Sequence, residues 1–129
     1  MKNHKKIDSQ FLGKISDTEY AKYLSKAAAL ALPSLEEGFG LPIIESMYLG
    51  CPVVCSDIEI FREVGGNAAL YFDPSSPNEL VENIRKLEIS NYRKEIIKKS
   101  IANAARFSWN KSASELKSFL YAIQRGGKN

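Results

Sequence analysis

The stretch that decides the fold is residues 27–55, AAALALPSLEEGFGLPIIESMYLGCPVVC. It opens and closes with strand-length apolar runs, at 27–32 and 52–55, and each run is followed by turn-forming residues. The runs are apolar throughout, without alternation, which is typical of strands in a parallel sheet covered by helices on both faces. Between them, Pro42 opens an apolar helix. The stretch therefore predicts two parallel strands joined by a loop and a helix.

The same alternation continues on both sides of this stretch. A third apolar run covers 68–72, and a shorter one covers 11–12. Strands that alternate with helices favour right-handed crossovers. We therefore expect an α/β fold, a Rossmann-like parallel sheet of about four strands with flanking helices. The expected domain covers 7–125, between a polar N-terminal tail at 1–6 and a flexible tail at 126–129.

Helix signals fill the segments between and after the apolar runs. Ser16 and Glu19 form a capping box, and Tyr20, Leu24 and Ala27 then share a helix face. Further along the chain we expect a second capping box, formed by Ser76 and Glu79 around Pro77. We also expect three inward-facing apolar stripes: Leu80, Ile84 and Leu87; Ile97, Ile101 and Ala104 in a helix over 92–107; and Trp109, Ala113, Leu116, Leu120 and Ile123 in a helix over 109–124.

Composition narrows the class of protein. The chain has 129 residues, of which 44% are hydrophobic and 26% charged, as in an ordinary globular domain. No run approaches the roughly 18 apolar residues of a membrane span, and no apolar stretch follows the basic N-terminus, so we expect no secretory signal. The net charge of +3 does not favour nucleic acid as a partner. We expect Cys51 and Cys55 to be reduced core residues.

The loop after the 27–32 run carries the most unusual local sequence. Ligands of open parallel sheets bind at the carboxyl ends of the strands, where this loop lies. Gly38 and Gly40 flank Phe39, and glycines let backbone N–H groups approach a ligand closely. Pro42 suits the first turn of the helix, whose free N–H groups form an anion site. The loop therefore predicts a phosphate site.

Two glutamates bracket this loop. We expect Glu37, on the loop, and Glu45, in the first helical turn, to reach one ligand around the same helix N-terminus. Ionised carboxylates only accept hydrogen bonds, so they suit hydroxyl groups on either side of a phosphate. A nucleotide-sugar has hydroxyl-rich ends and a central diphosphate and would fit, as would several other ligands.

The run Pro33-Ser34-x-x-Glu37-Gly38-Phe39-Gly40-Leu41-Pro42-x-x-Glu45 resembles the E-x7-E signature of retaining GT-B glycosyltransferases, above all the large group 1, or family 4, type. The resemblance spans Ile7 to Gln124, with further agreement at 50–54, 62–64, 68–70, 72–74 and 107–109. It implies that the chain is a partial C-terminal domain of a GT-B fold. It also implies a cytoplasmic enzyme, at the inner face of the membrane where its acceptors are lipid-linked.

The resemblance also implies roles for single residues. Glu37 would be the catalytic residue next to the donor sugar, and Glu45 would bind the ribose hydroxyls. The backbone of the intervening donor-binding residues, Gly38, Phe39, Gly40 and Leu41, would approach the sugar and the diphosphate. The reaction implied is retaining transfer from a UDP-, GDP- or ADP-sugar to a saccharide or lipid-linked acceptor, by a front-face mechanism. No metal and no other cofactor is expected.

The chain also departs from the family pattern. The N-terminal domain that holds the acceptor has no counterpart here, nor do the opening strands that supply an arginine and a lysine to the diphosphate. No Lys or Arg lies between Lys26 and Arg62, and a helix terminus contributes only about 0.3–1 kcal/mol to anion binding. We therefore expect weak donor binding and no useful catalysis from this chain alone. Self-association through uncovered apolar surface is a further expectation.

Other interpretations stay open. The chain could instead be a non-catalytic partner or regulatory module of a split glycosyltransferase, or a GT-B-fold sugar-nucleotide epimerase. We interpret Asp57 and Glu59 as a loop or helix cap and His4 as inert. A basic cluster at Arg93, Lys94, Lys98 and Lys99 is interpreted as a solvated helix face, with contact to anionic lipid as the alternative.

Overall fold

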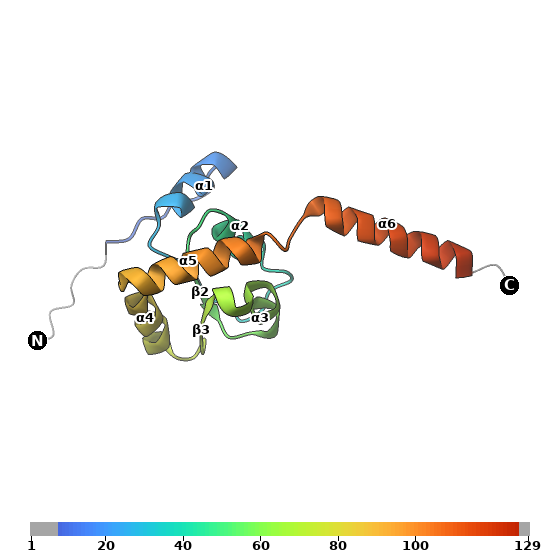
Figure 1. Cartoon of the computed structure of the whole chain (residues 1–129). Helices are drawn as coiled ribbons and strands as arrows, with labels where there is room; N and C mark the ends of the chain where they lie inside the picture. The colour runs from blue at the N-terminus through green and yellow to red at the C-terminus, as the bar shows by residue number, and fades with distance from the viewer. Residues whose placement is uncertain (1–7, 127–129) are drawn as a thin grey trace, which may run out of the picture.

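Three short parallel strands form the sheet in the computed structural model, which describes residues 8–126 (Figure 1). The strands, in their order across the sheet, are β1 (Leu30–Leu32), β2 (Val53–Ser56) and β3 (Leu70–Phe72). The central strand β2 is buried along its whole length. This burial is the reason why its sequence is apolar without alternation.

Helices connect and cover these strands. Over residues 8–126 they are α1 (Asp17–Lys26), α2 (Leu41–Tyr48), α3 (Glu59–Gly65), the short 3-10 helix η1 (Gly66–Ala68), α4 (Pro77–Lys86), α5 (Ser90–Ala104) and α6 (Trp109–Gly126). Figure 1 shows α5 lying across the body of the molecule and α6 extending away from it. None of the helices in this range has both the length and the apolar character that a membrane span requires.

The core has two parts because side chains of β2 alternate between the two faces of the sheet. Val53 and Cys55 join a cluster with Ile43 of α2 and Phe61 of α3. Val54 joins a second cluster, with Leu70, Phe72, Leu87 and Ile96, which come from β3, the residue after α4, and α5. Both cysteines are buried free thiols, which confirms their prediction as core residues.

One of the two predicted capping boxes is present. The backbone N–H of Glu19 donates to the Ser16 hydroxyl at 3.2 Å, and the Glu19 carboxylate accepts from the Ser16 N–H at 3.0 Å. The second prediction was wrong, because the Ser76 side chain makes no capping hydrogen bond. The Glu79 carboxylate instead reaches back to the N–H of Asp73, at 2.8 Å, and so holds the turn before α4.

The fourth predicted strand is absent from the described part of the chain. Phe11 is fully exposed, and residues 11–12 form no strand. The reason is local: the apolar run is only two residues long, and Gly13 turns the backbone away at φ 63°. Too few residues remain for a ladder of hydrogen bonds.

The inward face of α5 differs from the predicted stripe by a small rotation. Ile96, Ser100 and Ala104 are its buried residues, whereas Ile101 is exposed. The polar residue is accommodated because the Ser100 hydroxyl donates to the Ala68 carbonyl oxygen at 3.4 Å. Hydrophobicity alone could not reveal a buried serine at the centre of the contact.

The apolar stripe of α6 is not part of the core of residues 8–126, so that prediction was wrong. Trp109 is 83% exposed and Leu120 is 53% exposed, and Leu116 and Ile123 are similarly open. The periodicity correctly predicts an amphipathic helix, but no element between residues 8 and 126 covers its apolar face (Figure 1).

The basic cluster on α5 is only partly a solvated face. Arg93 donates to the Ala28 carbonyl oxygen at 2.6 Å and so ties α5 to the start of β1. Lys99 pairs with Glu95 at 2.6 Å, and Lys94 and Lys98 are exposed. The expected N-terminal tail, with His4, lies outside the described residues. Of the expected C-terminal tail, only Gly126 is described, as the last residue of α6.

Candidate functional site

The glycine turn that precedes α2 is present as predicted. Gly40 has φ 84° and ψ 37°, the left-handed region that favours glycine. A Cβ atom at this position would lie 3.4 Å from the buried ring of Phe61. Pro42 lies in the first turn of α2, where its missing N–H leaves no hydrogen bond unmade. The backbone conformation therefore requires glycine at position 40, whereas a Cβ there would make only ordinary van der Waals contact with Phe61.

Gly38 has a different environment. It is exposed, and a Cβ atom built on it would meet nothing within 4 Å. Neither its backbone nor its packing within the chain requires glycine. The absence of a side chain leaves open space beside the loop, next to the start of α2, where the Ile43 N–H donates to the Gly40 carbonyl oxygen at 3.0 Å.

Glu45 lines a hollow between α1 and α2. It lies in the second turn of α2, and not in the first turn as the sequence suggested, because the helix begins at Leu41. Asp17, Tyr20 and Tyr48 line the same hollow. Its volume of about 460 Å³ lies within the range of about 300–1,000 Å³ of small-molecule sites.

Glu37 lines a second hollow on the other side of the loop. The other residues of this hollow are Leu35, Glu36, Ile58, Glu59, Ile60 and Glu63, from the loop and from α3. Four carboxylates at one opening repel an anion but can accept hydrogen bonds from hydroxyl groups. The electrostatics of this hollow therefore suit a sugar and not a phosphate.

The two glutamates thus lie at two separate hollows and not at one. We expected both carboxylates around a single helix N-terminus, whereas Glu45 faces α1 and Glu37 faces α3. The loop that contains Gly38, Phe39 and Gly40 separates them. The two hollows share no lining residue, so a ligand that contacts both glutamates has to occupy both hollows.

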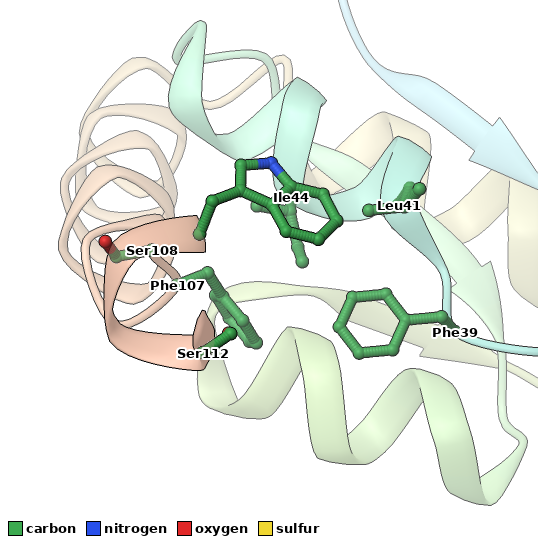
Figure 2. A pocket seen from close by; sticks show the side chains of 7 residues that line it. Phe39, Leu41, Ile44, Phe107, Ser108 and Ser112 are labelled. Carbon is green, nitrogen blue, oxygen red and sulfur yellow. The ribbon is translucent and has the colours of Figure 1, made fainter. Parts of the chain in front are cut away.

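An apolar pocket with aromatic side chains lies beside the hollow that Glu45 lines. Phe39, Leu41 and Ile44 line one side of this smaller pocket, and Phe107, Ser108, Trp109 and Ser112 form the opposite side. Figure 2 shows Phe39 and Phe107 facing each other across this pocket. Leu41, Ile44, Phe107 and Trp109 line both the pocket and the hollow, so the two are neighbours.

The arginines around the site are held by other groups. Both guanidinium nitrogens of Arg62 that face Asp57 bind its carboxylate, with Nη2 and Oδ2 2.6 Å apart, and this pair holds the pKa of Asp57 below its usual range. Asp57 therefore lies in the loop after β2, as predicted, and ties this loop to Arg62 of α3. Arg106 donates to Asn103 and lies over the ring of Phe107. Between residues 8 and 126, no three His, Cys, Asp or Glu side chains are placed to hold a metal ion.

Sequence reasoning did not single out Tyr20 or Phe107 as site residues. Tyr20 was assigned only to the inner face of its helix, and Phe107 only to the family pattern. The capping box was the available signal for Tyr20, since it sets the rotation of α1. The position of Phe107 depends on the turn between α5 and α6, for which the sequence has no comparable local marker.

The fold and this loop define the class of protein, and comparison with known sequences agrees. The family described as "Glycosyl transferases group 1" matches residues 2–120. The chain belongs to this family. Its parallel sheet with flanking helices is part of the Rossmann-like C-terminal domain of a GT-B glycosyltransferase.

The chain is also similar to individual glycosyltransferases. The chain is 34% identical over 107 residues to the O-antigen chain mannosyltransferase B of Escherichia coli, a match that covers 82% of this chain and 28% of that protein. It is 44% identical over 78 residues to the O-antigen chain mannosyltransferase RfbU of Salmonella typhimurium, covering 60% and 22%. An uncharacterized glycosyltransferase of Methanocaldococcus jannaschii, MJ1178, is 32% identical over 106 residues, covering 79% and 30%. The chain thus spans less than a third of the length of these relatives.

Proposed function

We propose that this chain is the donor-binding portion of a retaining glycosyltransferase that transfers mannose from a nucleoside diphosphate to a saccharide or lipid-linked acceptor. The observation that carries the proposal is the left-handed Gly40 turn at the start of α2, with Glu37 and Glu45 on either side of it, in a chain of the glycosyltransferase family. The choice of mannose and of a surface polysaccharide product is supported by the names of the O-antigen mannosyltransferase relatives. A nucleotide-sugar donor also favours the cytoplasm as the site of reaction.

The separation of the two hollows supports a long donor. The ribose would lie in the hollow of Glu45, and the sugar would lie near Glu37. The diphosphate between them would cross the loop beside Gly38 and lie near the positive end of the α2 dipole.

The proposed chemistry needs no metal and no cofactor. The bond between the anomeric carbon and the diphosphate oxygen breaks, and a bond from the same carbon to the acceptor oxygen forms on the same face. The proton of the acceptor hydroxyl passes to the departing diphosphate. Positive charge develops on the sugar ring meanwhile, and the carboxylate of Glu37 stabilises it. The cations that hold the diphosphate, and the acceptor site, would come from the rest of the enzyme.

The experiment is a titration of the chain with GDP-mannose, GDP and UDP, followed by NMR, for the wild type, Glu45→Ala and a control, Glu82→Ala. Glu82 is an exposed glutamate on α4, far along the chain from the loop. Loss of hydrogen bonds from the ribose to a carboxylate should weaken binding about 10- to 100-fold. The control should bind as the wild type does. Equal affinity in all three proteins would remove Glu45 from the site.

The exposed helix α6 supports a second candidate function for this chain. Its exposed apolar face suits a non-catalytic module that pairs with another chain, or with a second copy of this one. Sedimentation of the pure chain over a range of concentrations tests the second-copy form. A monomer at all concentrations would contradict self-association. Nucleotide binding that depends on Glu45 would instead favour the first candidate.

A further inference from the structure

Tyr20 and Glu45 line the same hollow from two different helices. Tyr20 lies in the first half of α1, and Glu45 lies in the second turn of α2. The tyrosine is half-buried, whereas the glutamate is exposed. The hollow thus has an acceptor-only carboxylate at its mouth and a phenolic hydroxyl in its wall.

Local structure fixes the rotation of α1 and hence the direction of Tyr20. The capping box at Ser16 begins the helix, and the Tyr20 N–H donates to the Ser16 carbonyl oxygen at 2.9 Å. Leu24, one turn further on, is buried in the body of the protein. Tyr23 lies on another side of the helix, is about half exposed and lines a different hollow, with Glu19, Lys22 and Lys26. Only one of the two tyrosines of α1 therefore meets Glu45.

The electrostatic environment agrees with this placement. Burial raises the pKa of Tyr20, and the neighbouring Glu45 carboxylate raises it further, followed by Cys51. Asp17 lines the same hollow and adds negative charge to it. The phenol is therefore protonated at neutral pH. A protonated phenol is able to donate a hydrogen bond to an acceptor-only carboxylate in the same hollow.

We propose that Tyr20 is a positioning residue, whose hydroxyl group holds one oxygen of the Glu45 carboxylate and so aims the remaining lone pairs at the paired hydroxyls of a ribose. This inference rests on the proposed function, because it assumes that a nucleoside diphosphate occupies the hollow. A carboxylate has about four acceptor sites. One hydrogen bond from Tyr20 therefore leaves enough acceptors for both ribose hydroxyls. The fixed carboxylate loses less rotational freedom when the ligand binds.

The test compares Tyr20→Phe with the wild type, using GDP and 2′,3′-dideoxy-GDP as probes. Tyr20→Phe keeps the ring and removes only the hydroxyl group. It should weaken the binding of GDP about three- to tenfold. The affinity for the dideoxy probe should be unchanged, since that probe has no ribose hydroxyls to donate to the Glu45 carboxylate. Tyr23→Phe is the matched control on the same helix and should bind both probes as the wild type does.

The possible failures are distinguishable. Equal weakening of both probes by Tyr20→Phe would assign Tyr20 a merely structural role and overturn the proposal. Unchanged GDP affinity in Tyr20→Phe, together with weak binding by Glu45→Ala, would overturn it while leaving the proposed function intact. If GDP does not bind the wild type at millimolar concentration, the proposed function fails, and this inference fails with it.

A second measurement needs no ligand. The pKa of Tyr20, followed through its assigned ring carbon resonance in NMR, should be lower in Glu45→Gln than in the wild type, because the negative charge that opposes ionisation has been removed. Glu82→Gln should leave it unchanged. The same pKa in all three proteins would show that Tyr20 and Glu45 are not neighbours and would overturn the proposal.

Discussion

The rings of Phe39 and Phe107 meet edge to face, with their centroids 6.5 Å apart and their planes at 86°. Phe39 belongs to the loop that precedes α2, and Phe107 belongs to the turn that leads into α6. The guanidinium of Arg106 lies 4.9 Å from the centre of the Phe107 ring. The loop proposed to hold the donor is therefore braced by the segment at the base of α6.

The aromatic pair should stabilise this loop measurably. A double-mutant cycle of Phe39→Ala and Phe107→Ala, measured by urea unfolding, should give a coupling of about 0.5–1.5 kcal/mol in the free energy of unfolding. Leu35, on the same loop and largely exposed, provides the control, and Leu35→Ala should show no coupling to Phe107→Ala. Strictly additive effects of Phe39→Ala and Phe107→Ala would contradict the contact.

The two glycines of the loop should respond differently to alanine. Gly40→Ala forces a side chain into the left-handed region, and should lower the free energy of unfolding by about 1–2 kcal/mol. Gly38→Ala meets open space and should change it by less than about 0.5 kcal/mol. Thermal and urea unfolding of both variants provide the measurement. Equal destabilisation would mean that the turn is not centred on Gly40.

The apolar face of α6 should contribute little to the stability of the isolated chain. Leu120→Ser should change the free energy of unfolding by less than about 0.5 kcal/mol, because the side chain is already open to water. Ile96→Ala, on the buried face of α5, should cost about 2–5 kcal/mol. A comparable loss in both variants would show that the α6 face is covered in solution.

Alkaline pH should destabilise the protein through Tyr71 and Cys55. Burial raises the pKa of each group to about 12, from ordinary values of 10.0 and 9.0. Because the folded pKa lies above the unfolded one, the stabilisation is complete below about pH 9 and is lost as the pH rises toward about 12.

Tyr71→Phe isolates one part of this effect. The variant loses the hydrogen bond to the Gly66 carbonyl oxygen, 2.7 Å long, and so is less stable at neutral pH. Its free energy of unfolding should nevertheless fall less steeply with pH above about 10 than that of the wild type. Tyr23→Phe should retain the wild-type slope. Identical slopes in all three proteins would contradict a raised pKa at Tyr71.

The local sequence was sufficient to predict the elements that are determined by interactions within a few residues. The continuous apolar run at 52–55 predicted a strand covered on both faces, Ser16 and Glu19 predicted the start of α1, and Gly40 with Pro42 predicted the turn into α2. Each of these rests on backbone conformation or on hydrogen bonds within a few residues. The structure confirms all three.

The remaining features depend on contacts between distant segments. Ser100 is tolerated in a buried position because a carbonyl oxygen of η1 accepts a hydrogen bond from its hydroxyl, and Arg93 donates to a carbonyl oxygen that precedes β1. The separation of Glu37 from Glu45 follows from the packing of α1 and α3 on opposite sides of the loop. Neither composition nor periodicity contains this information. An amphipathic stripe, as on α6, predicts that a helix has an apolar face but not that the same chain covers it.

In the proposed complex, a nucleoside-diphosphate sugar lies across the loop before α2. The most direct measurement is a titration of the full, isotopically labelled chain with GDP-mannose, followed through the backbone amide resonances. Binding across this loop should give saturable shifts at Gly38, Phe39 and Gly40 and at the hollow that Tyr20 and Glu45 line, and none at Lys94 and Lys98 on the outer face of α5. Shifts confined to other surfaces, or an absence of saturable shifts at the loop, would contradict it.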